Sequence, residues 1–269
     1  MTTAALAPRT ALFLPASNSR AIEKARGLDA DMVILDLEDA VKPQNKDTAR
    51  IAAVEAVAGG FGKSLSAIRL NGFDTPEHAA DVAAVAGSQA DYAVFPKAED
   101  AAEVARLIET LGKPLLAMIE TPLGVLAAAE IAALPGVAGV IAGTNDLAAT
   151  LRLPPSSGRE AMGVALQTIV LAARAGDAWA LDGVFNKLDD PEGLTAEGKA
   201  GRALGFDGKT LIHPNQIAIT SQAFGPTAEE IAEAEALIAA ATGGAERYRD
   251  RMIEAMHVKQ AKALLARLS

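Results

Sequence analysis

Short apolar runs alternate with longer amphipathic segments along most of the chain. Eight of these runs have the length and apolar character of buried strands, namely residues 11–14, 32–37, 65–70, 92–95, 115–119, 137–142, 179–184 and 207–212. The segments between them carry apolar residues at helical spacing, as Val104, Leu107 and Leu111 do before the fifth run. Proline and glycine stand at the joints, where they end one helix and start the next strand. This alternation predicts parallel strands connected by crossover helices.

The number of strand-helix units favours a closed barrel. Eight units within roughly 220 residues fit a (β/α)8 TIM barrel, which usually needs about 250 residues. The competing fold is an open, doubly wound sheet, which usually has fewer strands and, when it binds a nucleotide, a glycine-rich turn after the first strand. Residues 15–19 read Pro-Ala-Ser-Asn-Ser and contain no glycine. We therefore expect an α/β protein with a (β/α)8 TIM barrel.

The pattern changes after Pro214. A helix is predicted over residues 228–241, a break at Gly243 and Gly244, and a second helix over residues 247–268. This tail is too short for a second domain of ordinary size. We predict a catalytic barrel domain over residues 1–221 and a C-terminal helical extension over residues 222–269, packed on the barrel mouth or on a neighbouring subunit.

Composition excludes several classes of protein. The chain has 269 residues, of which 50% are apolar, so a disordered protein is excluded. The net charge of −9 disfavours nucleic acid and anionic membranes as partners, because an acidic surface repels phosphates. The chain has no cysteine, which rules out disulfides, thiolate metal sites and cysteine nucleophiles. We expect a cytoplasmic protein, since no apolar run reaches the ~18 residues of a membrane span and Pro15 interrupts the only N-terminal apolar patch.

Charged side chains follow most of the predicted strands. The charged residues at these strand ends include Asp36, Glu38, Asp39, Arg69, Lys97, Glu120, Asp146 and Asp182. The opposite joints are mostly proline, glycine, alanine and lysine. In TIM barrels the catalytic groups lie at the C-terminal ends of the strands. The asymmetry therefore predicts a polar site on that face of the barrel.

Glu120 and Asp146 end neighbouring strands. Two carboxylates about one strand spacing apart, ~5 Å, can share one hard cation such as Mg²⁺. Each of them also has a simpler role open to it, which is to cap the helix that follows. Taken together with Arg69 and Glu38 at the same mouth, they favour the metal site.

Two further pairs of roles stay open from the sequence. Arg69 either forks a substrate carboxylate or forms a structural ion pair with Asp36 or Glu38. Glu38 and Asp39 either accept hydrogen bonds from metal-bound waters or form salt bridges at the barrel end.

The same residues carry a family resemblance. The chain resembles the citrate lyase beta-subunit-like proteins of the HpcH/HpaI aldolase/citrate lyase superfamily. The matching segments follow the family order and are residues 12–15 (LFLP), 34–41 (ILDLEDAV), 69–71 (RLN), 96–97 (PK), 119–121 (IET), 143–148 (GTNDLA), 182–185 (DGVF) and 208–214 (GKTLIHP). The pyruvate aldolases of the superfamily carry an early histidine after the first strand. The first histidine here is His78, which argues against that branch.

The resemblance implies a Mg²⁺-dependent barrel that acts on thioesters of hydroxy acids with coenzyme A or an acyl carrier. By matching position, Glu120 and Asp146 would ligate the metal, and Arg69 and Glu120 would contact the substrate. Glu38 and Asp39 would orient waters around the metal. For the coenzyme A phosphates the candidates are Arg20, Lys24 and Lys97, which are equally well explained as surface cations.

Relatives place a C-terminal segment over the site of a neighbouring subunit, which implies a homo-oligomer, a trimer or a hexamer. An aspartate often follows Met-Ile there, whereas this chain has Met252-Ile253-Glu254. Glu254 is therefore the candidate for acid/base chemistry.

The predicted reaction is cleavage of a 3-hydroxyacyl-CoA, of the malyl-CoA or citramalyl-CoA type, to acetyl-CoA and a 2-oxo acid by retro-Claisen chemistry. Two alternatives stay open. One is a malyl-CoA-type thioesterase, and the other is a citrate lyase beta-subunit-like component of a larger complex without independent activity. Small acyl-CoA or 2-oxo acid molecules are the expected partners.

Overall fold

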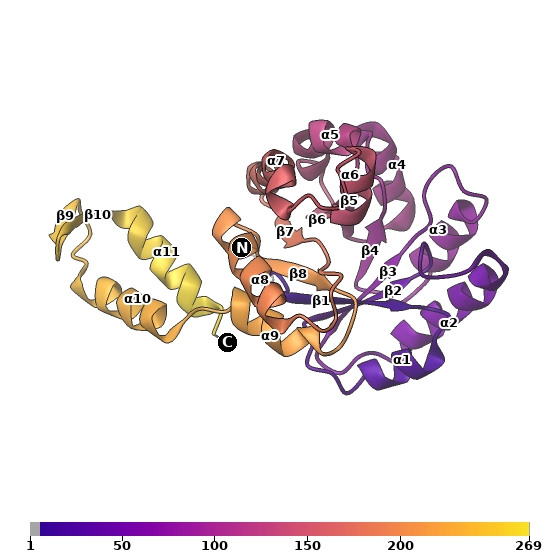
Figure 1. Ribbon diagram of the computed structural model, residues 1–269, viewed down its shortest axis with the longest axis horizontal. Helices are drawn as coiled ribbons and strands as arrows, with labels where there is room; N and C mark the ends of the chain where they lie inside the picture. Colours follow the sequence, from indigo (N-terminus) through magenta and orange to yellow (C-terminus); the bar gives the residue numbers. More distant parts are fainter. Residues whose placement is uncertain (1–5, 269) are drawn as a thin grey trace. The chain divides into compact units, whose positions relative to one another are not determined.

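A computed structural model describes residues 6–268. Contacts divide the chain into two compact units, one of which is Ala7–Ser221 and the other of which contains residues 222–268. In the first unit eight parallel strands close into a barrel in sequence order, with helices on the outside (Figure 1). The predicted (β/α)8 barrel is confirmed.

The eight predicted strands all form. They are β1 (Thr10–Pro15), β2 (Met32–Asp36), β3 (Leu65–Arg69), β4 (Tyr92–Phe95), β5 (Leu115–Ile119), β6 (Val137–Ala142), β7 (Trp179–Asp182) and β8 (Gly208–Leu211). The helical segments of this unit are α1 (Ser19–Ala25), η1 (Pro43–Asn45), α2 (Lys46–Ala58), α3 (His78–Ala86), α4 (Ala101–Leu111), α5 (Pro122–Ala132), α6 (Thr144–Thr150), η2 (Arg159–Met162), α7 (Gly163–Ala175) and α8 (Pro191–Leu204). Helix α9 (Gln216–Phe224) continues across the boundary between the two units.

Burial explains why the strands read as continuous apolar runs. All five residues of β2 are buried. Alternate side chains, such as Met32 and Ile34, fill the barrel interior together with Leu116 and Leu181. The other side chains face the surrounding helices, so both faces of each strand need apolar residues.

Local signals at the helix ends set where each helix starts and stops. The Asp100 side chain accepts a hydrogen bond from the backbone N–H of Glu103 at the start of α4. Gly112 ends that helix with φ of 59°, a left-handed conformation that suits glycine. Thr121 caps α5 in the same way and Pro122 begins that helix. Thr121 follows Glu120, so the cap of α5 stands beside a predicted site residue at the end of β5.

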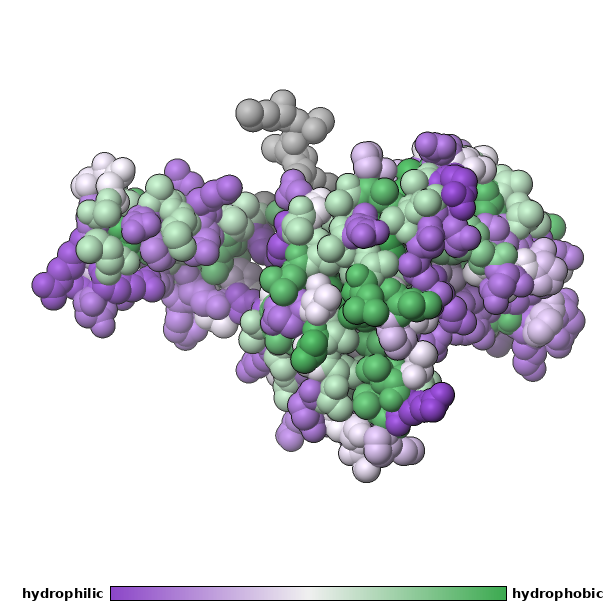
Figure 2. Space-filling model, turned by 90° about the horizontal axis from the view of Figure 1, so that it is seen from above, coloured by the Kyte–Doolittle hydropathy of each residue, from purple (hydrophilic) through white to green (hydrophobic). Residues whose placement is uncertain are grey.

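The barrel unit exposes several large apolar side chains. They belong to α5 and α7 in particular, with Leu126 and Val164 the most exposed. Figure 2 shows apolar surface, in green, on the face seen from above Figure 1, where both helices lie. Among the described residues, no helix is long and apolar enough to cross a membrane. The cytoplasmic location stays a prediction.

The C-terminal unit differs from its prediction. Helix α10 (Ala228–Ala240) forms as expected, but the predicted helix over residues 247–268 is wrong in its first part. Strands β9 (Glu246–Tyr248) and β10 (Arg251–Ile253) pair as an antiparallel hairpin, and α11 (Ala255–Ala266) starts only afterwards. Tyr248 and Ile253 pack into a small core with α10, which the hairpin makes possible. Whether this unit covers the barrel mouth or a neighbouring subunit stays a prediction.

Candidate active site

A cavity of about 390 Å³ opens at the C-terminal ends of the barrel strands. Polar and apolar side chains share its wall. The residues that line it are Phe13, Leu14, Pro15, Asp36, Asp39, Ala40, Arg69, Met118, Glu120, Ala142, Gly143, Thr144, Asn145, Asp146, Val184, Thr210 and Ile212. Four of the predicted site residues, Asp39, Arg69, Glu120 and Asp146, therefore line one cavity, at the end of the barrel where the strand-end charges predict a site. Glu38 and Lys97 contact members of this set.

Arg69, at the end of β3, is held by the carboxylate of Asp36, and each oxygen of that carboxylate accepts two hydrogen bonds. Its Nε lies 2.7 Å from Oδ1 of Asp36 and its Nη2 lies 2.5 Å from Oδ2. Asp36 also accepts hydrogen bonds from the backbone N–H groups of Glu38, at 2.8 Å, and Ala40, at 3.1 Å. The structural ion pair, one of the two roles left open for Arg69, is thus formed. Its substrate role stays a prediction that rests on the remaining nitrogen.

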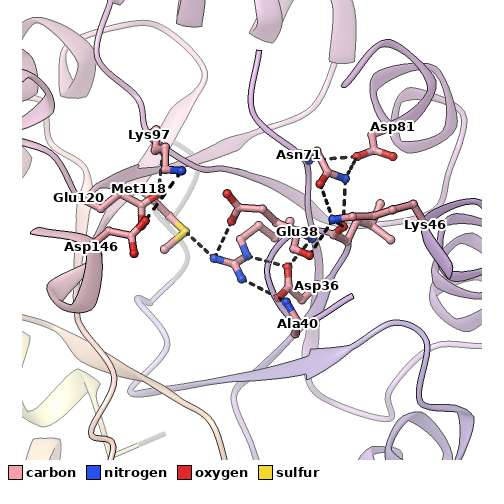
Figure 3. Close-up of polar contacts among 12 residues, drawn as sticks. Asp36, Glu38, Ala40, Lys46, Asn71, Asp81, Lys97, Met118, Glu120 and Asp146 are labelled. Carbon is pink, nitrogen blue, oxygen red and sulfur yellow. Dashed lines mark hydrogen bonds and ion pairs between the residues drawn. The ribbon is translucent and has the colours of Figure 1, made fainter. Parts of the chain in front are cut away.

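That remaining nitrogen, Nη1, faces the cavity wall. It lies 2.9 Å from Oε2 of Glu38 and 3.8 Å from Sδ of Met118 (Figure 3). The guanidinium also lies 4.9 Å from the centre of the Phe13 ring. Burial disfavours the charge on Arg69, but the hydrogen bonds and charge of Asp36 hold its pKa above the ordinary value. Arg69 is therefore a permanent cation at the barrel mouth.

Glu38 is buried behind this guanidinium and does not line the cavity. Its Oε2 has no hydrogen bond of suitable geometry among the described residues, although it forms the ion pair with Arg69. Burial raises the pKa of Glu38 to about 8, against the opposing effect of the positive charge of Arg69. Asp39, next in the chain, is exposed and lines the cavity. Their predicted contact with metal-bound waters stays a prediction.

Glu120, directly after β5, is buried in the cavity wall. Its Oε1 accepts a hydrogen bond of 2.8 Å from the backbone N–H of Lys97, a residue in the left-handed region with φ of 47°. A Cβ on Gly143 would stand 2.3 Å from Oε2 of Glu120, so only glycine leaves room for this carboxylate. Burial raises the pKa of Glu120 to about 7, and the charge of Asp146 acts in the same direction.

Asp146 stands in the first turn of α6, which follows β6. It lines the same cavity as Glu120 and is partly exposed. The nearest cation is Nζ of Lys97, 4.0 Å from Oδ2 of Asp146 (Figure 3). Strands β5 and β6 are paired with Ile119 opposite Ala142, which brings the two loops together. The structure thus places both predicted ligands at one end of the barrel.

The chemistry of this pair fits a hard divalent cation. No cluster of three or more histidine, aspartate or glutamate side chains suited to a metal occurs between residues 6 and 268. Mg²⁺ needs only one or two carboxylates and takes its other oxygens from water and substrate. Within residues 6–268, Oε2 of Glu120 accepts no hydrogen bond that would compete with a metal. Glu120 is buried and Asp146 is half-exposed, and their one ion pair among the described residues is the 4.0 Å contact of Asp146 with Lys97, so the pair can accept the positive charge of a cation.

Three further predicted residues are exposed on the surface of their units. Arg20 and Lys24 are exposed on α1 and do not line the cavity. Glu254 is exposed in the C-terminal unit, at the residue before α11, where its backbone N–H donates to Nδ1 of His257 at 3.0 Å. Their roles with coenzyme A and in acid/base chemistry stay predictions.

Asp182 was counted among the strand-end charges, and it belongs to a different cluster. It is fully buried, with Nζ of Lys209 3.1 Å from Oδ2 and Nη2 of Arg159 2.6 Å from Oδ1. Glu197, on α8, lies 2.6 Å from the same lysine nitrogen. This outer cluster (Arg159, Asp182, Glu197 and Lys209) ties β7 and β8 to α8. No local sequence signal announces it.

A second unpredicted network lies behind Glu38. Lys46 donates to the backbone carbonyls of Leu37 and Glu38 and to Asn71, and Asn71 is held in turn by Asp81. The sequence offers one hint of it, since Asn71 closes the Arg-Leu-Asn segment of the family resemblance.

A barrel with acidic strand ends around one arginine defines the class of protein. A profile of the HpcH/HpaI aldolase/citrate lyase family matches residues 9–214, and the chain belongs to this family. The resemblance seen in the sequence is thereby confirmed.

Individual relatives narrow the comparison. A (3S)-malyl-CoA thioesterase of Cereibacter sphaeroides is 42% identical, over 96% of this chain and 94% of that protein. A citrate lyase subunit beta-like protein of Mycobacterium tuberculosis is 36% identical, over 95% of this chain and 94% of that protein.

Among solved structures, CitE of Mycobacterium tuberculosis in complex with magnesium, acetoacetate and coenzyme A superposes with a TM-score of 0.84 at 34% identity. It covers 98% of both chains.

Proposed function

We propose that this protein is a Mg²⁺-dependent enzyme that hydrolyses the coenzyme A thioester of a 3-hydroxy dicarboxylic acid of the (3S)-malyl-CoA type. The observation that carries this proposal is the pair of carboxylates, Glu120 and Asp146, beside the guanidinium of Arg69 in one cavity. Thioesterases of Cereibacter sphaeroides at 42% and 43% identity over nearly the whole chain support hydrolysis.

Cleavage of the carbon-carbon bond of the same substrate is the second candidate. The sequence alone favours it, and the solved structure of CitE with magnesium and pyruvate supports it, because pyruvate is a 2-oxo acid. Both reactions need the same contacts to the substrate. In carbon-carbon cleavage a base removes the proton of the substrate hydroxyl and the C–C bond breaks, whereas in hydrolysis a base takes a proton from the water that attacks the thioester carbonyl and the C–S bond breaks.

Glu120 and Asp146 would hold the Mg²⁺. When bound, the ion would polarise the oxygens of the substrate and stabilise negative charge that develops on them. Oε1 of Glu120 stays on the N–H of Lys97, which fixes the carboxylate and leaves Oε2 for the ligand.

Arg69 would neutralise the substrate carboxylate or the developing oxyanion. Because Asp36 holds two of its nitrogens, the guanidinium keeps one orientation and presents Nη1 toward the cavity. The Phe13 ring and the sulfur of Met118 also contact the guanidinium, and these apolar groups would limit the access of water to its charge. Glu254 of a neighbouring subunit stays the candidate acid/base, and Arg20, Lys24 and Lys97 stay the candidates for the phosphates.

The apolar residues on α5 and α7 support the proposed homo-oligomer, a trimer or a hexamer. Leu123, Leu126, Val164 and Leu171 are all exposed on these helices. Such a patch on a barrel is typical of a surface that another subunit covers.

The deciding experiment is incubation of the protein with malyl-CoA, with Mg²⁺ and with EDTA. Hydrolysis releases malate and free coenzyme A, whereas carbon-carbon cleavage releases glyoxylate and acetyl-CoA. Malate and thiol that appear only with Mg²⁺ support the proposal. Glyoxylate would select the second candidate. No turnover of malyl-CoA, citramalyl-CoA or related free thioesters would favour a component of a larger complex.

A further inference from the structure

The loop after β2 carries Glu38 and Asp39, and the side chain of Asp36 holds its backbone. The Asp36 carboxylate accepts hydrogen bonds from the N–H groups of Glu38 and Ala40. These amides therefore point toward the Asp36 carboxylate, which lines the cavity, and the carbonyls of Leu37 and Glu38 need a different partner.

Lys46, the first residue of α2, satisfies those carbonyls. Its Nζ donates three hydrogen bonds of 2.7 Å each, to the carbonyls of Leu37 and Glu38 and to Oδ1 of Asn71. An ammonium has three donors, so its capacity is used completely. None of the three acceptors carries a charge, and no ion pair of Lys46 occurs among residues 6–268. Lys46 thus donates its hydrogen bonds to backbone carbonyls and to an amide, and not to a carboxylate.

The third acceptor is itself held in one orientation. Nδ2 of Asn71 donates to Oδ2 of Asp81 at 2.6 Å and to the carbonyl of Leu37 at 3.0 Å. Nε of Arg50 lies 2.6 Å from Oδ1 of Asp81, which is fully buried. The amide oxygen of Asn71 must therefore face Lys46. Since Asn71 follows β3, which ends in Arg69, Lys46 joins the loop after β2 to the loop after β3 (Figure 3).

We propose that Lys46 is a positioning residue, which holds the carbonyls of residues 37 and 38 so that Glu38 stays on Nη1 of Arg69. Lys46 does not line the cavity, so it acts only through this loop. The inference rests on the proposed function in one respect, namely that Arg69 faces the substrate in the reaction. A purely structural role of Lys46 would change stability and leave turnover per folded molecule alone.

The test compares Lys46→Met with Lys42→Met as the matched control. Lys42 is exposed, lies four residues earlier and makes no side-chain hydrogen bond at the start of η1. The readouts are kcat and KM for malyl-CoA, the thermal midpoint, and hydrogen exchange of the amides of Glu38 and Ala40. Lys46→Gln, which keeps an uncharged donor, replaces Lys46→Met if the latter does not fold.

In Lys46→Met we expect amide exchange in this loop to rise by at least about tenfold, because the loop loses two charge-assisted hydrogen bonds and its link to Asn71. We expect kcat to fall by about 10- to 100-fold with KM within about threefold, as for loss of an interaction made in the transition state. Lys42→Met should match the parent in every readout.

Unchanged exchange at Glu38 and Ala40 would overturn the inference. So would a kcat of Lys46→Met within about twofold of the parent, since a lost transition-state interaction lowers kcat. If no thioester is turned over, the proposed function fails, and the exchange measurement still decides the positioning role of Lys46.

Discussion

Two acidic clusters lie near the C-terminal ends of the barrel strands, and they are compensated very differently. In the outer cluster, Asp182 and Glu197 meet Lys209 and Arg159 at distances of 2.6 to 3.6 Å. In the cavity, the one ion pair that the described residues offer to Glu120 or Asp146 is the 4.0 Å contact between Nζ of Lys97 and Oδ2 of Asp146, and the charge of Arg69 acts on Glu120 without an ion pair.

This difference separates a structural role from a functional one. A fully paired buried cluster has no chemistry left to offer a ligand. Glu120, a buried carboxylate whose pKa burial raises, lies at the same cavity as a second carboxylate, and added positive charge would stabilise its ionised form, which marks a candidate functional site. Acidic residues at strand ends are therefore not equivalent, although they look alike in the sequence.

The largest expected effect is the loss of activity on replacement of Asp146. Replacing Asp146 with Asn should lower Mg²⁺-dependent turnover by at least about a thousandfold, because half of the protein ligand set is lost. The thermal midpoint without Mg²⁺ should not fall, since the change relieves repulsion with Glu120. Steady-state rates across Mg²⁺ concentrations and thermal unfolding in EDTA measure the two effects. Full activity in chelator would refute the metal assignment.

In the outer cluster a substitution should lower stability and leave the turnover rate nearly unchanged. Replacing Lys209 with Met leaves the buried Asp182 and the largely buried Glu197 with less positive charge, and should destabilise the fold by about 3 kcal/mol. Turnover per folded molecule should stay within about twofold, because surviving folded molecules keep the cavity. Urea unfolding and active-site-normalised rates test this. A large loss of kcat without loss of stability would mean that the cluster takes part in the reaction.

Acidity provides a third test. Glu38 and Glu120 have folded pKa values of about 8 and about 7, above their ordinary 4.5. Between pH 4.5 and about pH 8 the folded chain then binds more protons than the unfolded chain, so the free energy of unfolding falls as pH rises. In EDTA the free energy of unfolding should decrease by about 1 to 3 kcal/mol between about pH 5 and about pH 8.

Two controls sharpen the acidity test. Glu120→Gln should flatten part of the pH dependence, because the titrating group is gone. Mg²⁺ should restore stability at the alkaline end, since it favours the ionised carboxylates. A stability that rises steadily with pH in EDTA would contradict the burial assigned to both glutamates.

The smallest expected effect is that of a single methyl group. Gly143→Ala places a Cβ against the Glu120 side chain and should destabilise by about 1 to 2 kcal/mol while weakening Mg²⁺ binding. Gly163→Ala is the control, because a Cβ there meets nothing within 4 Å. Unfolding curves and Mg²⁺ titration by calorimetry compare the two. Equal behaviour of both variants would show that Gly143 does not shape the carboxylate.

The sequence predicts the barrel well because its signals are local. Apolar runs bounded by proline and glycine locate all eight strands, and the topology then brings the strand ends together. Glu120 and Asp146 reach one cavity for this reason, as the strand-end argument predicts. The pairing of Arg69 with Asp36 was one of two open roles, because side-chain geometry decides it.

What the sequence hides depends on contacts between distant residues. The hairpin of residues 246–253 has strands of three residues each, and two of its arginines, Arg249 and Arg251, pair with Glu233 of α10. No local periodicity encodes such a partner. Lys46 is hidden in the same way, because two of its acceptors are backbone carbonyls and its helix position resembles any exposed lysine.

The seam between the first and last strands has a consequence for biosynthesis. Strand β1 pairs with β8, with Ala11 opposite Thr210, and Phe13 and Thr210 both line the cavity. A nascent chain must therefore be synthesised through β8 before this wall exists. A ligand added during translation can therefore stabilise only chains in which the barrel is complete. It does not bind, and so does not stabilise, a chain whose synthesis stops before β8.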